Sequence, residues 1–258
     1  MLEIQNLQKS FNIGTENETI IFNNFNFHIN KGECTGILGA NGCGKSTLFN
    51  IISGVLVQEK GDIILNGKNI NKLKENERAQ FIGRVHQNPS SGVSPSLTIL
   101  ENICLSDKKC QKFTLRKLIN KNKINEYKEI LKALDLGLEN KLDTEVKYLS
   151  GGQRQSLSLL MATINKPELL LLDEHTAALD PKTSRLIMEK TQELIKTYNI
   201  TTMMISHNVK DAIKYSDRIV MLDNGRVMLD VKNGSITENE LISIYNSRNY
   251  ASPLQEAV

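Results

Sequence analysis

The pattern of apolar and polar residues along the chain indicates two kinds of strand. Phe25, Phe27 and Ile29 alternate with polar residues, which is the period of a strand with one buried face. Residues 168–172 and 200–205 are almost entirely apolar, as expected of strands in a parallel sheet that is covered on both faces. The pattern therefore predicts strands and turns in the first third of the chain and a parallel sheet later.

Helical segments occupy the middle of the chain. Thr98, with Glu101 three residues later, has the spacing of a capping box and predicts a helix start. Asp180 before a proline predicts another start, because aspartate caps a helix and proline suits its first position. From about residue 88 to residue 149 the helical segments alternate with lysine-rich connections. We expect one α/β domain with an inserted helical subdomain.

Composition narrows the class of protein. The chain has 258 residues, of which 40% are hydrophobic, and its net charge is only +3. With 5% aromatic residues and no tryptophan, it lacks the basic and stacking surfaces typical of nucleic-acid binding. The start of the chain does not resemble a secretory signal, and no apolar run approaches the length of a membrane span. Four cysteines without metal-ligand spacing indicate a reducing cytosol: Cys34, Cys43, Cys104 and Cys110.

A lysine-rich stretch, residues 108–128, has two interpretations. It is either a solvated face of the helical subdomain or a contact with anionic lipid.

Residues 39–46 match the pattern G-x-x-x-x-G-K-[ST] of a phosphate-binding loop. Glycines let the backbone wrap closely and point successive N–H groups at an anion, and the following helix adds its positive end. In such a loop Lys45 contacts the β- and γ-phosphates and the Ser46 hydroxyl contacts Mg²⁺. The alternative is a plain glycine-rich turn, with Cys43 filling space. The predicted nucleotide contacts are Gly39, Asn41, Gly42, Cys43, Gly44, Lys45, Ser46 and Thr47.

Two carboxylates, Asp173 and Glu174, end the apolar run at 169–172. Ligands of open α/β sheets bind at the carboxyl ends of strands, so this position suits a site. Asp173 is the candidate ligand of Mg²⁺, and Glu174 is the candidate base for the water that attacks a γ-phosphate. The alternative is that both residues only solvate the end of a core strand.

The pentapeptide Leu-Ser-Gly-Gly-Gln at residues 149–153 is the most specific motif. Ser150 caps a helix, and the glycines expose its N-terminus as a second anion site. With a phosphate loop before it and an acidic strand end after it, the sequence resembles the ABC-type ATPases from Met1 to about Asn246. In that family two subunits pack head to tail, and the signature of one caps the γ-phosphate held by the other. The resemblance implies that role for Ser150, Gly151, Gly152 and Gln153.

The resemblance also implies functions for residues that the patterns alone do not select. Gln87 matches the glutamine that contacts Mg²⁺ and water, and His207 matches the histidine that contacts the γ-phosphate. Asp180 matches the residue of the D-loop, a role compatible with helix capping. Phe11 matches the aromatic residue that stacks on adenine, and its alternative is a core position. His175 stands where most relatives have proline, which is expected to make that turn less rigid.

The fold implied by the resemblance is α/β. It has a P-loop NTPase (RecA-like) core, an N-terminal antiparallel β subdomain and an inserted α-helical subdomain at about residues 88–157. The ATPase domain is expected at residues 1–246, followed by a mobile C-terminal tail at 247–258.

The function implied by the resemblance is ATP hydrolysis in an ABC importer, similar to the tryptophan/tyrosine type, with ATP and Mg²⁺ bound. Its partners would be a second ATPase subunit, most simply an identical one, an integral membrane permease and an extracytoplasmic substrate-binding protein, with no nucleic acid. The subunit would lie at the cytoplasmic face of the cell membrane. Two alternatives have similar motifs: an ATPase of iron–sulfur cluster assembly and the ATPase subunit of an exporter.

Overall fold

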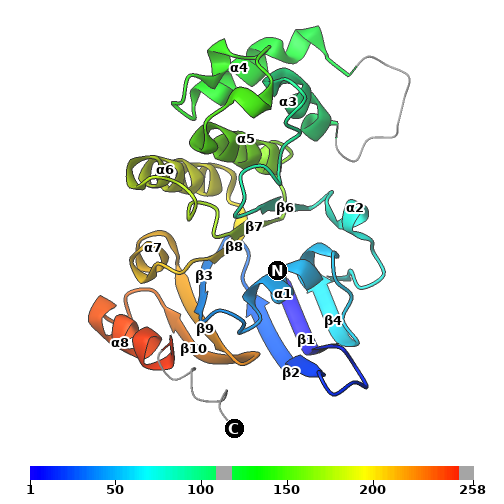
Figure 1. Ribbon diagram of the computed structural model, residues 1–258, viewed down its shortest axis with the longest axis vertical. Coiled ribbons are helices and arrows are strands. Elements are labelled where there is room, and N and C mark those ends of the chain that lie inside the picture. Colours follow the sequence, from blue (N-terminus) through cyan, green and yellow to red (C-terminus); the bar gives the residue numbers. More distant parts are fainter. Residues whose placement is uncertain (109–117, 250–258) are drawn as a thin grey trace. The chain divides into compact units, whose positions relative to one another are not determined.

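The computed structural model of the protein describes residues 1–108 and 118–249 (Figure 1). Part of the lysine-rich stretch with Cys110, and residues 250–258 of the predicted tail, lie outside this description. The chain divides into two compact units, which are taken separately. Unit 1 consists of Met1–Arg78 and the residues from Thr201 onward, and unit 2 consists of Ala79–Ile200.

Unit 1 contains an antiparallel sheet in the order β2-β1-β4-β5. Its buried face carries Phe25, Phe27 and Ile29, as the alternation predicts. Asn66, at φ 48°, makes the turn between its last two strands. The pattern did not predict the first strand, whose pairing with β2 is interrupted by register shifts. The strands are β1 (Leu2–Phe11), β2 (Thr19–Ile29), β4 (Lys60–Leu65) and β5 (Lys68–Asn69).

Unit 1 also contains strands in the order β10-β9-β3-β8. Strand β3 pairs in parallel with β8 and β9, and β9 forms an antiparallel hairpin with β10. All residues of β3 and β8 are buried, which for β8 agrees with the strand predicted at 200–205. These strands are β3 (Cys34–Gly39), β8 (Thr201–Ile205), β9 (Arg218–Asp223) and β10 (Arg226–Lys232).

Helices of unit 1 follow its parallel strands. Helix α1 (Lys45–Ser53) follows β3, and α7 (Val209–Tyr215) follows β8, while α2 (Glu75–Arg78) is one short turn. The buried residues Ala212 of α7 and Leu241 of α8 (Glu238–Asn249) join one core cluster with Leu38 and Ile219. Helix α8 continues to Asn249, three residues into the segment expected to be a tail.

Unit 2 combines a parallel strand pair with helices (Figure 1). The strands are β6 (Ile82–Val85) and β7 (Leu169–Asp173), and the α-helices are α3 (Ile99–Asp107), α4 (Ile124–Lys132), α5 (Gly151–Thr163) and α6 (Pro181–Tyr198). Short 3₁₀ turns lie at Lys121–Lys123, Leu138–Asn140 and Val146–Tyr148.

The helical part of unit 2 has a core of its own. Leu157 and Leu160 are buried in it, and Met161 and the C-cap residue Ile164 pack against it, so these residues form one apolar face at helical spacing. Both hydrogen bonds of the predicted capping box at Thr98 and Glu101 are present at the start of α3. Within residues 1–108 and 118–249, no helix combines the length and apolarity that a membrane span requires.

Candidate functional site

The phosphate loop joins β3 to α1 in unit 1. Gly39 has φ 151°, and a Cβ atom there would lie 2.4 Å from the carbonyl oxygen of Leu222, so a side chain is excluded. The backbone N–H of Gly225, in the turn between β9 and β10, donates to the carbonyl of Cys43 at 3.2 Å. The loop is therefore held by its own strand and by the neighbouring hairpin.

Lys45 lies inside this loop, with its side chain almost entirely buried. Its Nζ donates to the carbonyl oxygens of Gly39 at 2.6 Å and Ala40 at 2.8 Å. A fixed ammonium group beside the N-terminus of α1 gives this loop the positive charge that an anion site requires. Burial raises the pKa of the Cys43 thiol, which fits a space-filling residue rather than a nucleophile.

His207 comes from the strand beside the phosphate loop. The backbone N–H of Ser206 donates to the carbonyl of Ile37 at 3.2 Å, so β3 and β8 end at the same edge of the sheet. His207 follows directly and is exposed, and Asn208 then caps α7. The predicted γ-phosphate contact and the predicted phosphate loop therefore lie at the same edge of the sheet in unit 1.

Phe11 ends β1 and is 36% exposed, with Lys9 Nζ 5.2 Å from its ring centroid. The alternative of a core position is therefore wrong, and the ring is available for stacking.

In unit 2, as in unit 1, candidate site residues directly follow the carboxyl ends of two neighbouring parallel strands. Val85 of β6 lies opposite Leu172 of β7, and the strands run in parallel. Gln87 follows the first strand, while Asp173 and Glu174 follow the second. An exposed amide and two carboxylates therefore leave the same edge of unit 2.

The two carboxylates differ in environment. Asp173 Oδ2 accepts from Arg84 Nη2 at 2.9 Å, and both side chains are largely buried. Glu174 has φ 47°, a left-handed conformation that is unusual outside glycine. Its carbonyl accepts from the backbone N–H of Ala177 at 3.0 Å, which closes a tight turn around the acidic side chain.

His175, next in this turn, is buried, and burial lowers its pKa to about 4. Its Nε2 lies 3.2 Å from the Thr191 hydroxyl of α6. The neutral ring ties the turn to that helix. The expectation that this turn is less rigid than one with proline stays a prediction.

The signature begins α5. Ser150 is the N-cap, and its hydroxyl accepts from the backbone N–H of Gln153 at 3.2 Å. The Gln153 side chain bonds back to the Ser150 backbone and also donates to the carbonyl of Leu136 at 3.3 Å. At Gly152, a Cβ atom would lie 2.3 Å from Cγ2 of Thr183 in α6, so a larger residue here would require the Thr183 side chain or the helix to move.

Asp180 is the N-cap of α6, as predicted, and its carboxylate accepts from the backbone N–H of Thr183 at 3.0 Å. Hydrogen bonds from the Thr183 side chain and backbone lower the pKa of Asp180. Its charge is therefore fixed at the helix start.

Two contacts of unit 2 were not predicted from the sequence. Arg84 is a charged residue in the middle of a short, otherwise apolar strand, and that contrast was the available indication. Gln155 is fully buried on α5, and its Nε2 donates to the carbonyl of His86, directly before Gln87. This bond connects the signature helix to the segment that carries the predicted glutamine.

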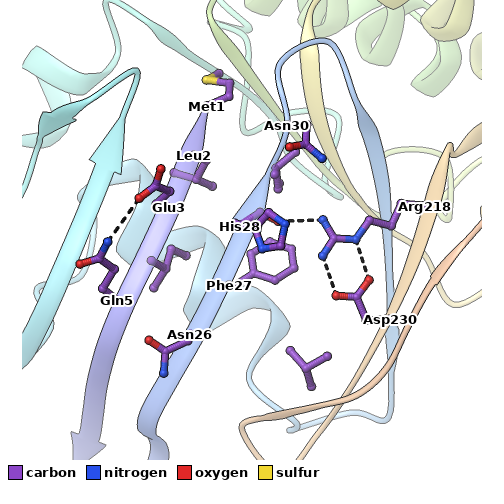
Figure 2. Close-up of a pocket in the computed structure, with 13 residues that line it drawn as sticks. Met1, Leu2, Glu3, Gln5, Asn26, Phe27, His28, Asn30, Arg218 and Asp230 are labelled. Carbon is purple, nitrogen blue, oxygen red and sulfur yellow. Dashed lines mark hydrogen bonds and ion pairs between the residues drawn. The ribbon is translucent and has the colours of Figure 1, made fainter.

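A pocket of ≈ 520 Å³ in unit 1 is lined by residues other than the predicted site residues (Figure 2). Figure 2 shows the Arg218 guanidinium between the backbone of His28 and the carboxylate of Asp230. Arg218 donates to that carbonyl at 2.9 Å and to that carboxylate at 2.5 and 2.6 Å. The charges of Arg218 and Asp230 therefore neutralise each other within unit 1. We interpret this pair as a structural contact between strands and not as part of a catalytic site.

Comparison with known proteins agrees with these features. The family model described as "ABC transporter" matches residues 22–177. A tyrosine transport ATP-binding protein of Clostridioides difficile is 47% identical over 232 residues, which cover 90% of this chain and 92% of that protein. A spermidine/putrescine import ATP-binding protein of Legionella pneumophila is 33% identical over 88% of this chain, which spans only 58% of that longer relative.

Among solved structures, a dimeric ATP-binding cassette in a post-hydrolysis state with ADP and Pi has a TM-score of 0.78 and 29% identity. The match covers 92% of this chain and 100% of that one. It confirms the predicted α/β P-loop NTPase fold. The family match spans more than half of the 258 residues. The chain therefore belongs to the ABC transporter family and is one of its ATP-binding, ATP-hydrolysing subunits.

Proposed function

We propose that this chain is the ATPase subunit of an ABC importer and that the imported solute is an aromatic amino acid. The observation that carries this function is the 47% identity, over nine-tenths of both chains, with a protein named for tyrosine transport. The relative named for spermidine/putrescine import supports the direction of transport.

The phosphate loop is proposed to hold the triphosphate of ATP. Its backbone N–H groups and the start of α1 supply positive potential without moving. The buried Lys45 ammonium exchanges its two loop carbonyls for the β- and γ-phosphate oxygens, which are stronger acceptors. The exposed Phe11 ring stacks on adenine. The loop contacts are Gly39, Asn41, Gly42, Cys43, Gly44, Ser46 and Thr47.

The donors assigned to Mg²⁺ fit that ion. The Ser46 hydroxyl, the Gln87 amide and the Asp173 carboxylate offer oxygen, the ligand atom that Mg²⁺ prefers. In the part of the chain that the structure describes, no three His, Cys, Asp or Glu side chains gather into a metal cage. This suits an ion held by one carboxylate, phosphates and water. When bound, the ion neutralises charge on the β- and γ-phosphates.

Hydrolysis then depends on positioning and charge stabilisation. Glu174 orients a water molecule for attack on the γ-phosphorus and accepts its proton as ADP leaves. The backbone at Glu174 is held in a tight turn, and the buried neighbour His175 ties that turn to α6. Gln87 and His207 contact the attacking water and the γ-phosphate.

A second copy of the chain is proposed to complete each site. The described sequence motifs include one phosphate loop and one signature, and each stands at the start of a helix, α1 or α5. In a head-to-tail pair, Ser150, Gly151, Gly152 and Gln153 of one copy contact the γ-phosphate held by the other, with Asp180 beside them. Closure of the pair around two ATP molecules drives transport, and hydrolysis reopens it.

The remaining partners are a membrane permease and an extracytoplasmic substrate-binding protein. The chain is proposed to reach the cytoplasmic face of the membrane through the permease, and the solute contacts lie on the other subunits.

Affinity purification of the tagged chain from gently solubilised native membranes tests this function, with the soluble fraction processed in parallel. The Glu174→Gln variant serves as a matched sample that retains ATP-bound complexes. We expect a polytopic permease and a binding component, and the binding component should show a thermal shift with tyrosine or another aromatic amino acid. Recovery only from the soluble fraction, with iron–sulfur assembly proteins as partners, would overturn the importer assignment.

A further inference from the structure

The ion pair between Arg84 and Asp173 lies where the metal ligand of the ATPase is assigned. We propose that Arg84 is a positioning residue that pairs with the Asp173 carboxylate before nucleotide binds. When Mg²⁺ binds with ATP, the ion replaces the guanidinium at this carboxylate. Arg84 thereby determines how strongly ATP binding depends on Mg²⁺. This inference rests on the proposed function, because it uses the assignment of Asp173 to the metal.

The geometry follows from the register of the parallel pair. Arg84 of β6 lies opposite Leu171 of β7, two residues before Asp173. Residues two apart on a strand share a face, so a long side chain at Arg84 reaches the end of β7 along that face. Arg84 Nη2 and Asp173 Oδ2 are 2.9 Å apart, within the range of a charge-assisted hydrogen bond.

Burial makes this pair more than a surface contact. The Arg84 and Asp173 side chains are only 13% and 14% exposed. A buried carboxylate needs a counter-charge to offset the free-energy cost of its burial. Exposed ion pairs, by contrast, contribute little to stability. Strand β6 is otherwise Ile82, Gly83 and Val85, a sequence that offers no other reason for a guanidinium. Arg84 therefore supplies the positive charge that Asp173 lacks before a metal arrives.

The same charge opposes the metal. A guanidinium does not lose its proton in proteins, so Arg84 keeps its positive charge when a divalent cation approaches Asp173. Binding of Mg²⁺ requires the 2.9 Å bond to lengthen, and the cation then meets a like charge nearby. Before the metal binds, the guanidinium instead favours the extra negative charge of metal-free ATP. Arg84 thus narrows the difference in affinity between ATP with and without Mg²⁺.

The test measures this difference by binding rather than by turnover. The Kd of a fluorescent ATP analogue is determined for the full chain in EDTA and in saturating Mg²⁺. The Kd in EDTA divided by the Kd in Mg²⁺ measures how strongly the metal favours nucleotide binding. For Arg84→Met we expect this ratio to rise about tenfold over the wild type, because one competing charge is gone. Arg84→Lys should stay near the wild-type ratio, because it keeps the charge.

Two further variants make the outcome decisive. Lys196→Met removes an exposed positive charge from the far end of α6 and should leave the ratio unchanged. Asp173→Asn should reduce the ratio toward one. If Asp173→Asn has no effect, the assignment of Asp173 to the metal fails, and with it this part of the proposed function. If Asp173→Asn acts as expected but Arg84→Met matches the wild type or lowers the ratio, only the role of Arg84 is overturned.

Discussion

Replacing Arg78 with methionine tests how the end of α1, the helix that follows the phosphate loop, is held. Arg78 is 2% exposed and donates to four backbone carbonyls. These are Ile51 at 2.8 Å, Ile52 at 3.0 Å, Leu73 at 3.0 Å and Asn71 at 3.3 Å. Ile51 and Ile52 lie in the last turn of α1, where carbonyls lack partners further along the helix. The Ile51 carbonyl also accepts from the backbone N–H of Gly54 at 3.2 Å, so Arg78 is its second donor, and the guanidinium charge favours the negative end of the helix dipole.

The magnitude follows from these contacts. A hydrogen bond to a charged group contributes about 1.5–3 kcal/mol, and a buried carbonyl left without a donor costs about 1–3 kcal/mol. Methionine preserves much of the packing volume, and water reaches some of the vacated carbonyls. We therefore expect the free energy of unfolding to fall by about 4 kcal/mol. For a chain of this size such a loss lowers the Tm by roughly 8–16 °C.

Urea unfolding followed by circular dichroism measures this change, with Arg78→Lys as the matched control. Lysine keeps the charge but has its donors on a single nitrogen, so it should restore about half of the lost stability. A loss below about 1 kcal/mol for Arg78→Met would refute the reasoning, because water would then replace the guanidinium at these carbonyls without cost.

Three further changes probe the site itself. His175 is neutral when folded, with a pKa of about 4, and takes up a proton when unfolded below about pH 6.5, so acid destabilises the fold. Between pH 7.5 and pH 5 the wild type should lose about 2 kcal/mol more than His175→Gln in urea titrations, and parallel profiles would contradict this. Gly152→Ala places a Cβ atom 2.3 Å from Cγ2 of Thr183 and should lower the Tm and the ATPase rate together, whereas an unchanged Tm would mean that the Thr183 side chain or α6 moves aside without cost. Glu174→Gln should bind ATP, lose turnover and accumulate an ATP-bound dimer on size exclusion, and hydrolysis at the wild-type rate would exclude Glu174 as the base.

Much of the fold was predictable because local patterns and long-range packing agree. The alternation at Phe25, Phe27 and Ile29 survives in β2, and the capping residues Thr98 and Asp180 begin their helices as expected. The strand β1 was missed because its pairing with β2 is broken by register shifts, which disturb the period of two.

The motifs of the site were predictable where the chemistry dictates spacing along the chain. The phosphate loop and the signature each act through consecutive backbone groups, so their residues stand together in the sequence. Arg84 and Asp173 are 89 residues apart and meet only through the pairing of β6 with β7. The bond between His175 and Thr191 likewise depends on how α6 packs. Such contacts require the tertiary structure, because nothing in the local sequence fixes the partner.

Uptake of radiolabelled tyrosine tests the central claim most directly. Cells of the source organism that lack this chain would be complemented with the wild type or with Glu174→Gln, both verified to reach the membrane fraction. We expect the wild type to restore uptake and the Glu174→Gln variant to leave it at the level of the deletion. Restored uptake with Glu174→Gln would contradict the proposed hydrolysis mechanism. Tyrosine uptake that does not depend on the chain at all, with the other aromatic amino acids giving the same result, would contradict the assignment as an aromatic amino acid importer.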